Sequence, residues 1–329
     1  MTPKTYRKAL ASCLGAALLL PLTGLSQQPK PPQNPPTLPQ GPIRVGVDLV
    51  NLFATVRDKD KRLVPNLTKD RFEVYEDGKL QEIDFFKAEG ELPLTMGIVM
   101  DTSGSMDTIF GAEQEAASRF LQRVLRPKKD LAMIMTFDTD VDLLADFTND
   151  QNRLERAIQR ARVNSGGPRV TPGTVPSTTG GTNLYDAVYL ACREKLARES
   201  GRKAIILLTD AADTGSKVSL KEALETAQRA DTVIHVLFIE AGGGWGLRGG
   251  GDAGVAKKLA DETGGRMIAV NNHRDLEKAF DQISEELRSQ YTLGYYSTNS
   301  ARDGAFRKLK VEVKDHKVLA RKGYYAPKG

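Results

Sequence analysis

The sequence has few of the residues that build disulfide frameworks or histidine-based catalytic sites: the chain of 329 residues contains two cysteines and three histidines. Cys13 lies in an N-terminal apolar stretch, and once that stretch is removed Cys192 has no partner for an intramolecular disulfide. Cys192 lies in a helical pattern, where we expect it on the core face. Because His235, His273 and His316 lie in different predicted elements and none follows a credible nucleophile, the sequence does not suggest a Ser-His-Asp set.

The sequence also lacks a dense basic patch with interleaved aromatic residues, which is the usual sign of nucleic-acid binding. The formal net charge is +5, but Lys4, Arg7 and Lys8 supply three of these charges and no acid precedes residue 48. Without the N-terminal segment the chain is nearly neutral, so we expect no nucleic-acid partner. The hydrophobic content of 40% and the charged content of 27% are typical of a soluble globular protein.

Residues 1–26 have the pattern of a signal peptide. A basic start is followed by the apolar core LGAALLLPLTGL and by small residues that allow cleavage near Ser26. Pro21 interrupts the apolar run, which is short for a transmembrane helix, so an uncleaved anchor is the lesser alternative and the only expected membrane contact. Residues 27–42 are rich in Pro and Gln and predict an extended linker. We therefore expect an exported protein, which is periplasmic, at the cell surface or secreted.

Two β-rich segments, residues 43–91 and 289–329, flank the middle of the chain. The first contains the hairpin pattern FEVYEDGKLQEIDFF with DG at the turn, and the second contains the alternating pattern KLKVEVK of a half-exposed strand. Neither segment can bury a core alone. We therefore predict that they pair into one small β-sandwich, with residues 92–288 inserted between them.

The middle segment alternates apolar runs with helical patterns. LTMGIVM, AIILLT and VIHVLFI are continuous apolar runs bounded by polar residues, as in parallel strands that are buried on both faces. The alternation predicts an α/β fold with a doubly wound, mostly parallel sheet. In such sheets ligands bind at the carboxyl ends of the strands.

Asp101, Ser103 and Ser105 lie at one such strand end, in the stretch GIVMDTSGSM. A carboxylate and two hydroxyls that point into one crevice form a set of hard oxygen ligands. This set suits a cation such as Mg²⁺ and does not suit zinc, which prefers His or Cys. Taken alone, the same residues also fit a helix N-cap followed by turn formers.

The stretch DTSGS resembles the Asp-x-Ser-x-Ser motif of the von Willebrand factor type A (VWA) domain, which opens the metal-ion-dependent adhesion site. GGTNLYDAV and AIILLTDAAD resemble the two later segments that complete this site. The resemblance implies a Rossmann-like VWA domain of the bacterial exported type that binds Mg²⁺ or Mn²⁺. Residue by residue, it assigns the metal ligands Asp101, Ser103, Ser105, Thr182 and Asp210.

The sequence departs from the family pattern after Asp210, where Ala211 stands in place of the usual glycine. Because alanine lacks the access of glycine to positive φ, the local turn is expected to differ, whereas the ligand side chains are intact.

The resemblance further implies a binding protein and not an enzyme. In such domains an acidic side chain of a protein partner, Asp or Glu, replaces a water on the metal, which indicates an adhesion or scaffold function. Further partner contacts are expected at Gly181, Asn183 and Trp245. One alternative is a structural envelope protein whose metal site is empty. A less favoured alternative is a hydrolase, because phosphatases with an aspartate nucleophile carry a second aspartate where this chain has Ser103.

Overall fold

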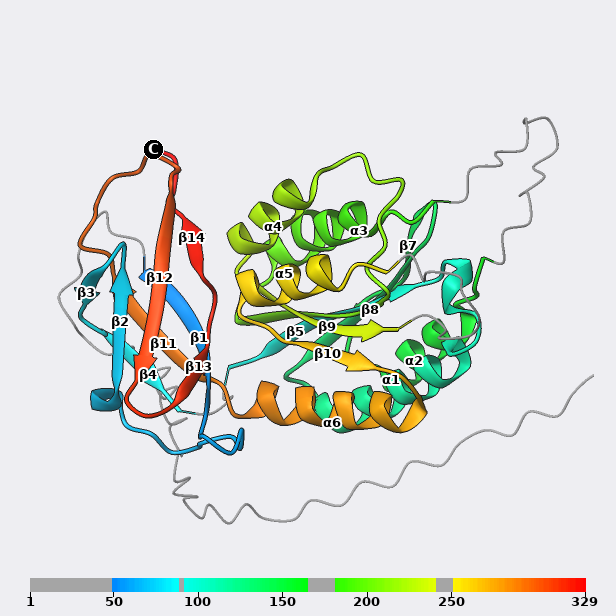
Figure 1. Cartoon of the computed structure of the whole chain (residues 1–329), viewed down its shortest axis with the longest axis horizontal. Coiled ribbons are helices and arrows are strands. Elements are labelled where there is room, and N and C mark those ends of the chain that lie inside the picture. Colours follow the sequence, from blue (N-terminus) through cyan, green and yellow to red (C-terminus); the bar gives the residue numbers. More distant parts are fainter. Residues whose placement is uncertain (1–48, 89–91, 165–180, 241–250) are drawn as a thin grey trace, which may run out of the picture. The chain divides into compact units, whose positions relative to one another are not determined.

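A computed structural model of the chain describes residues 49–88, 92–164, 181–240 and 251–329. The expected signal peptide, the expected linker and Trp245 lie outside the described residues. Within the described ranges, the chain forms one six-stranded sheet with helices and two four-stranded antiparallel sheets (Figure 1).

The six-stranded sheet carries the candidate site. Its strand order is β10-β9-β8-β5-β6-β7, and only β7 runs antiparallel to its neighbour. The strands are β5 (Leu94–Asp101), β6 (Leu131–Phe137), β7 (Val141–Thr148), β8 (Arg202–Thr209), β9 (Thr232–Ile239) and β10 (Met267–Val270). All eight residues of β5 are buried, which explains why its sequence is a continuous apolar run. The predicted doubly wound, mostly parallel α/β fold is confirmed.

Helices cover both faces of this sheet (Figure 1). One face packs against α1 (Phe110–Val124), α2 (Gln151–Arg160) and α6 (His273–Arg288). The other face packs against α3 (Leu184–Leu190), α4 (Leu220–Arg229) and α5 (Ala253–Thr263). Within the part of the chain that the structure describes, no helix is both long and apolar enough to cross a membrane.

Alternate side chains of β5 enter two separate cores. Met96, Ile98 and Met100 belong to the core under α1, α2 and α6, whereas Val99 belongs to the core under α3, α4 and α5. Cys192 is fully buried in the second core, in a π-helical turn (Ala191–Lys195) that continues α3 into a 3₁₀ turn (Leu196–Arg198). Burial raises the pKa of the Cys192 thiol to about 12, so it is an inert core residue.

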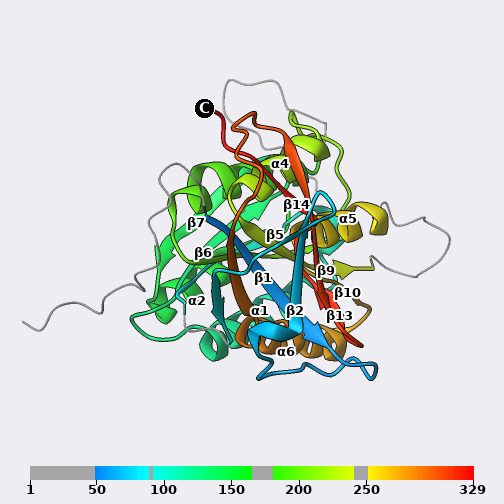
Figure 2. The ribbon, with the colours of Figure 1, turned by 90° about the vertical axis from the view of Figure 1, so that its left-hand side faces the viewer.

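The two four-stranded sheets form the sandwich. One sheet has the order β13-β1-β11-β4, with β1 (Leu49–Arg57), β4 (Phe85–Lys87), β11 (Tyr291–Tyr296) and β13 (Lys317–Leu319). The other has the order β14-β12-β2-β3, with β2 (Phe72–Glu76), β3 (Lys79–Gln81), β12 (Phe306–Val313) and β14 (Gly323–Tyr325). A short 3₁₀ turn (Lys69–Arg71) precedes β2. Figure 2 shows these strands in front of the six-stranded sheet.

Long-range pairing joins the ends of the chain, as the sequence predicted. β1 pairs with β11 and β2 pairs with β12, so each sheet contains strands from both β-rich segments. Their inward side chains, among them Leu52, Val74 and Leu293, form one shared core. The predicted hairpin turn is also present: Asp77 and Gly78 both have positive φ, of 48° and 82°, between paired Glu76 and Lys79.

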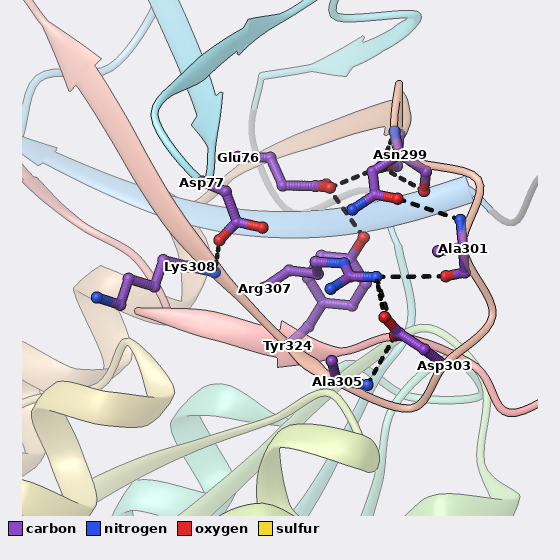
Figure 3. Close-up of polar contacts among 10 residues, drawn as sticks. Glu76, Asp77, Asn299, Ala301, Asp303, Ala305, Arg307, Lys308 and Tyr324 are labelled. Carbon is purple, nitrogen blue, oxygen red and sulfur yellow. Dashed lines mark hydrogen bonds and ion pairs between the residues drawn. The ribbon is translucent and has the colours of Figure 1, made fainter.

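A buried carboxylate, Glu76 at the end of β2, connects the two sheets of the sandwich. It accepts hydrogen bonds from the hydroxyls of Tyr295 (2.6 Å), Ser297 (2.6 Å) and Tyr324 (3.0 Å). Burial and this carboxylate raise the pKa of Tyr324 to about 12, so its hydroxyl remains a donor. Figure 3 shows Glu76 beside Tyr324 and the loop before β12.

A second buried carboxylate, Glu286 on α6, binds the sandwich to the helical part. Its side chain lies 2.5 Å from the Arg57 guanidinium of β1 and 2.9 Å from Arg266, which precedes β10. His235 of β9 lies 3.8 Å away, and burial lowers the pKa of its imidazole, which favours the neutral form. Four elements therefore meet at one ion-pair cluster.

We predict that Glu76→Ala destabilises the protein by about 3 kcal/mol, because one buried and two partly buried hydroxyls lose their acceptor. Glu73→Ala is the matched control. Glu73 lies in the same strand and accepts a hydrogen bond from Tyr75, but its side chain is exposed, so the expected change is within about 0.5 kcal/mol. Urea denaturation measures both free energies of unfolding. Equal losses in the two variants would contradict the role given to Glu76.

Candidate metal-binding site

Asp101 is the last residue of β5 and is fully buried where the central strand ends. One carboxylate oxygen accepts a hydrogen bond from the backbone N–H of Ser103 (2.9 Å), and the other accepts one from the hydroxyl of Thr209 (2.6 Å). Thr209 ends β8, which pairs with β5 in parallel. Parallel strands place their carboxyl ends at one edge of the sheet, which is why these two side chains meet.

Ser103 and Ser105 follow in a tight turn. Gly104–Met106 is a single 3₁₀ turn, and it brings the two serine hydroxyls to within 3.0 Å of each other. Thr102 secures the start of this turn, because its N–H and its hydroxyl both donate to the Phe137 carbonyl at the end of β6. Ser103 is partly exposed and Ser105 is exposed, so solvent reaches this turn.

Thr182 and Asp210 lie on the two neighbouring loops, which are hydrogen-bonded to each other. The Thr182 carbonyl accepts from the N–H groups of Thr214 (3.0 Å) and Gly215 (3.3 Å), and the Thr182 N–H donates to the Thr214 hydroxyl. Asp210 follows Thr209 directly, and one of its oxygens accepts from the Ala212 N–H (3.0 Å). Within the described residues, no hydrogen bond joins the Thr182 hydroxyl to the other predicted ligands.

The site accumulates negative charge. Burial raises the pKa of Asp101 from 3.8 to about 6, hydrogen bonds from Ser103 and Thr209 act against this rise, and the charge of Asp210 adds to it. Neither carboxylate forms an ion pair with Lys, Arg or His in the part of the chain that the structure describes.

Glu113 of α1 adds a third acid near Asp101. It is fully buried, and neither of its carboxylate oxygens has a hydrogen-bond partner. Burial, and secondarily the charge of Asp101, raises the pKa of Glu113 well above its usual value. The shift favours the neutral form of this acid, and a nearby positive charge would act against it.

The residue types of the predicted set suit a hard divalent cation. Carboxylate oxygens of Asp101 and Asp210 and hydroxyl oxygens of the other three residues would be the ligands, which is the chemistry that Mg²⁺ and Mn²⁺ accept. The unbalanced negative charge at Asp101 is the feature that such an ion would offset. Among the described residues, no group of three or more His, Cys, Asp or Glu side chains could hold a metal, so a site here depends on the hydroxyls.

Ala211 adopts the left-handed backbone conformation that glycine favours. Its φ is 60°, and its N–H donates to the Thr209 hydroxyl (2.9 Å). This φ strains an alanine by roughly 1 kcal/mol, but its methyl group is fully buried in the core under α3, which offsets about 0.8 kcal/mol. The turn is therefore kept with little net strain.

The expected partner contacts differ in their surroundings. Asn183 is partly buried: its side-chain amide donates to the Thr139 carbonyl (2.5 Å), and its N–H donates to the Asp138 carbonyl (2.8 Å). Gly181 packs against Gly215 beside Thr182. The hydrogen bonds of Asn183 thus hold the Thr182 loop in place, and the use of either residue in partner contacts stays a prediction.

Sequence reasoning missed two residues of this site, Thr209 and Glu113. Each had a signal in the sequence. Thr209 is a hydroxyl residue at the end of an apolar run, directly before a predicted ligand. Glu113 lies at helical spacing with Phe110 and Ala116, so it shares the buried face of α1.

Residues 96–213 match the family model of the von Willebrand factor type A domain. No curated protein matches the sequence of the chain. Among solved structures, BatB of Bacteroides thetaiotaomicron has 18% identity and a TM-score of 0.47, with 59% of this chain and 97% of that chain covered. A von Willebrand factor type A protein of Catenulispora acidiphila has 12% identity and a TM-score of 0.49, with coverages of 85% and 74%.

Proximal thread matrix protein 1 of the mussel byssus, solved with a zinc-occupied MIDAS motif, has 14% identity and a TM-score of 0.49. The comparison covers 64% of this chain and 49% of the mussel protein, so the chain spans about half of its length. Similarity at this level says nothing about the ligands or partners of the chain. The match to the family model confirms the expected von Willebrand factor type A domain over residues 96–213.

Proposed function

We propose that the chain is an exported protein-binding module that captures an acidic side chain of a partner through a divalent cation, Mg²⁺ or Mn²⁺. The observation that carries this proposal is the buried Asp101 carboxylate, which ends the central strand beside the Ser103 turn and forms no ion pair with a Lys, Arg or His side chain among the described residues. Export is proposed from the signal-peptide pattern of residues 1–26.

Each proposed ligand has a distinct task. Asp101 supplies a fixed negative charge, because Thr209 and the Ser103 N–H hold its orientation. Ser103 and Ser105 supply two neutral oxygens from one tight turn, and Thr182 and Asp210 supply oxygens from two loops that are hydrogen-bonded to each other. A bound ion would supply Lewis acidity toward a carboxylate that enters from solvent, where the serines are exposed.

The proposal divides the mature chain into a VWA domain of residues 92–288 and a sandwich made of residues 43–91 and 289–329. The sandwich would present the VWA domain, and the linker of residues 27–42 would separate both from the point of attachment. Under this proposal no reaction is catalysed. Both carboxylate oxygens of Asp101 accept hydrogen bonds, which lowers their nucleophilicity and speaks against the hydrolase alternative.

Loss of a residue that only contacts a metal ligand weakens metal binding by roughly 10–100-fold. We predict that Asp101→Asn weakens Mg²⁺ binding by more than this, because it removes the fixed negative charge. Asp107→Asn is the matched control, since Asp107 is exposed two residues beyond Ser105. Ser103→Ala and Ser105→Ala should weaken binding less. Thr182→Ala should reduce partner binding more than metal binding.

Calorimetric titration with Mg²⁺ and Mn²⁺ measures these affinities. Equal affinity in the wild type and in Asp101→Asn would remove the proposed site. An absence of metal binding in the wild type would favour the structural envelope protein, and turnover of a phosphoester by the wild type would favour the hydrolase.

We further predict that Mg²⁺ raises the melting temperature more at about pH 7.5 than at about pH 5, because the cation needs an ionised Asp101. The pKa of Asp101 in the folded, metal-free protein, about 6, is higher than its ordinary value of 3.8. The stabilisation from protonation of Asp101 is therefore complete below the ordinary pKa and is lost as pH rises through about 6. The metal-free protein should lose stability over this range.

Thermal unfolding in EDTA and in Mg²⁺ measures this effect. Glu113 and Asp210 are the other acids near Asp101, so each needs its own variant. Asp101→Asn should abolish the pH dependence of the Mg²⁺ effect, and Glu113→Gln should preserve it. A Mg²⁺ effect that does not change with pH in the wild type would contradict the prediction.

A further inference from the structure

An arginine-lined cleft lies on the same side of the sheet as α1. It has a volume of about 780 Å³ and is formed by α2, the segment after it and β7. Its walls are Leu144, Arg153, Arg156, Gln159, Arg160 and Arg162. Four of these six residues are cations and none is an acid. The four arginines are all exposed.

Helical geometry explains why the arginines gather there. Arg153, Arg156 and Arg160 follow the i, i+3, i+7 spacing of one helix face, opposite the buried face of Leu154, Ala157 and Ile158. The axial rise of a helix separates Arg156 from Arg160 by roughly 6 Å. Two side chains at alternate positions of an extended peptide are separated by roughly 6.6 Å, so they match this spacing.

Arg156, Arg160 and Arg162 have no acidic partner in the described part of the chain, whereas the charge of Arg153 helps to lower the pKa of Asp146 on β7. Arg160 donates to the Leu144 carbonyl (2.9 Å), and Arg162 donates to the Ala161 carbonyl (2.7 Å) and to the Gln159 carbonyl. None of the four forms an ion pair with another described residue. Backbone carbonyls thus hold two of the guanidinium groups in place while their charge stays available to a ligand.

A second cleft continues this surface toward the candidate metal site. It has a volume of about 570 Å³, shares Gln159 and Arg162 with the first cleft, and reaches Asp107 and Phe110 at the start of α1. Asp107 directly follows the turn that holds Ser105. The segment after α2 also contacts this loop, because the Asn164 N–H donates to the Thr102 carbonyl (2.7 Å).

We propose that the two clefts bind an acidic, extended polypeptide segment of the partner, with Asp or Glu at alternate positions over Arg156 and Arg160. This inference rests on the proposed function, in which another acid of the same partner binds at the metal site. Guanidinium groups bind carboxylates in a bidentate manner, and the apolar and amide walls at Leu144, Phe110 and Gln159 suit a peptide. Charge complementarity therefore selects a partner that carries several acidic side chains and not only the one at the metal site.

The test is fluorescence anisotropy with a labelled peptide of alternating Glu and Ser, in Mg²⁺ or in EDTA. Arg156→Gln/Arg160→Gln should weaken binding by roughly fivefold and reduce its salt dependence. The matched control is Arg193→Gln/Arg198→Gln, which removes two exposed arginines after α3, on the opposite face of the sheet, and should bind like the wild type. A peptide with Gln in place of Glu should bind to none of these proteins.

Equal binding by the two double variants would overturn the inference, whether or not binding needs Mg²⁺. Peptide binding in EDTA and by Asp101→Asn tests the metal site separately. If the peptide still binds in both cases and Arg156→Gln/Arg160→Gln still weakens binding, the proposed metal function is wrong and the proposal for the arginine cleft is kept. Polygalacturonate, which carries carboxylates on a sugar backbone, is the second probe. Tighter binding of polygalacturonate than of the peptide, with the same dependence on Arg156 and Arg160, would overturn the choice of a polypeptide.

Discussion

The desolvated carboxylate of Asp101 at the end of β5 is the feature around which the loops of the VWA domain are arranged. A charge inside a protein is unfavourable unless hydrogen bonds or an opposite charge offset the loss of water. Thr209 and the Ser103 N–H offset part of this loss, yet the pKa of Asp101 remains at about 6. At neutral pH the site therefore holds a carboxylate for which a cation is the natural complement.

The same hydrogen bonds that orient Asp101 also join the strand ends to one another. Thr102 binds the end of β6, Asn183 binds Asp138 just beyond that strand, and Thr182 binds the loop that follows β8. Three loops that are distant in sequence thus share one rigid edge of the sheet. Among the described residues, the carboxylate of Asp101 is joined there to N–H and hydroxyl groups and not to a basic side chain.

The sandwich is connected to this domain through α6 in two ways. The helix ends at Arg288 and the chain enters β11 at Tyr291, so the connection is short. Glu286, two residues before the end of the helix, is also buried between Arg57 of β1 and Arg266, which precedes β10. A displacement of α6 along its axis has to separate a buried carboxylate from its guanidinium partners, which is strongly unfavourable. The position of α6 is therefore tied to the sandwich.

Electrostatics also distinguishes the two parts of the proposed binding surface. The candidate metal site concentrates acids, whereas the face of α2 beside it concentrates arginines. A partner with a run of acidic residues meets both requirements, because one carboxylate can bind a cation while others face guanidinium groups. A partner with a single acidic side chain would bind only at the candidate metal site.

The sequence alone determined the elements whose signals are local. Continuous apolar runs predicted the buried parallel strands, the Asp77-Gly78 pair predicted the hairpin turn, and the spacing of Asp101, Ser103 and Ser105 predicted a cluster of oxygens. Only the tertiary structure decided which distant residues meet. The bond from Thr209 to Asp101 needs the pairing of β8 with β5, which no local pattern states. Helical spacing places Glu113 on the apolar face of α1, but only the packing of α1 on the sheet decides that its carboxylate is buried without a hydrogen-bond partner.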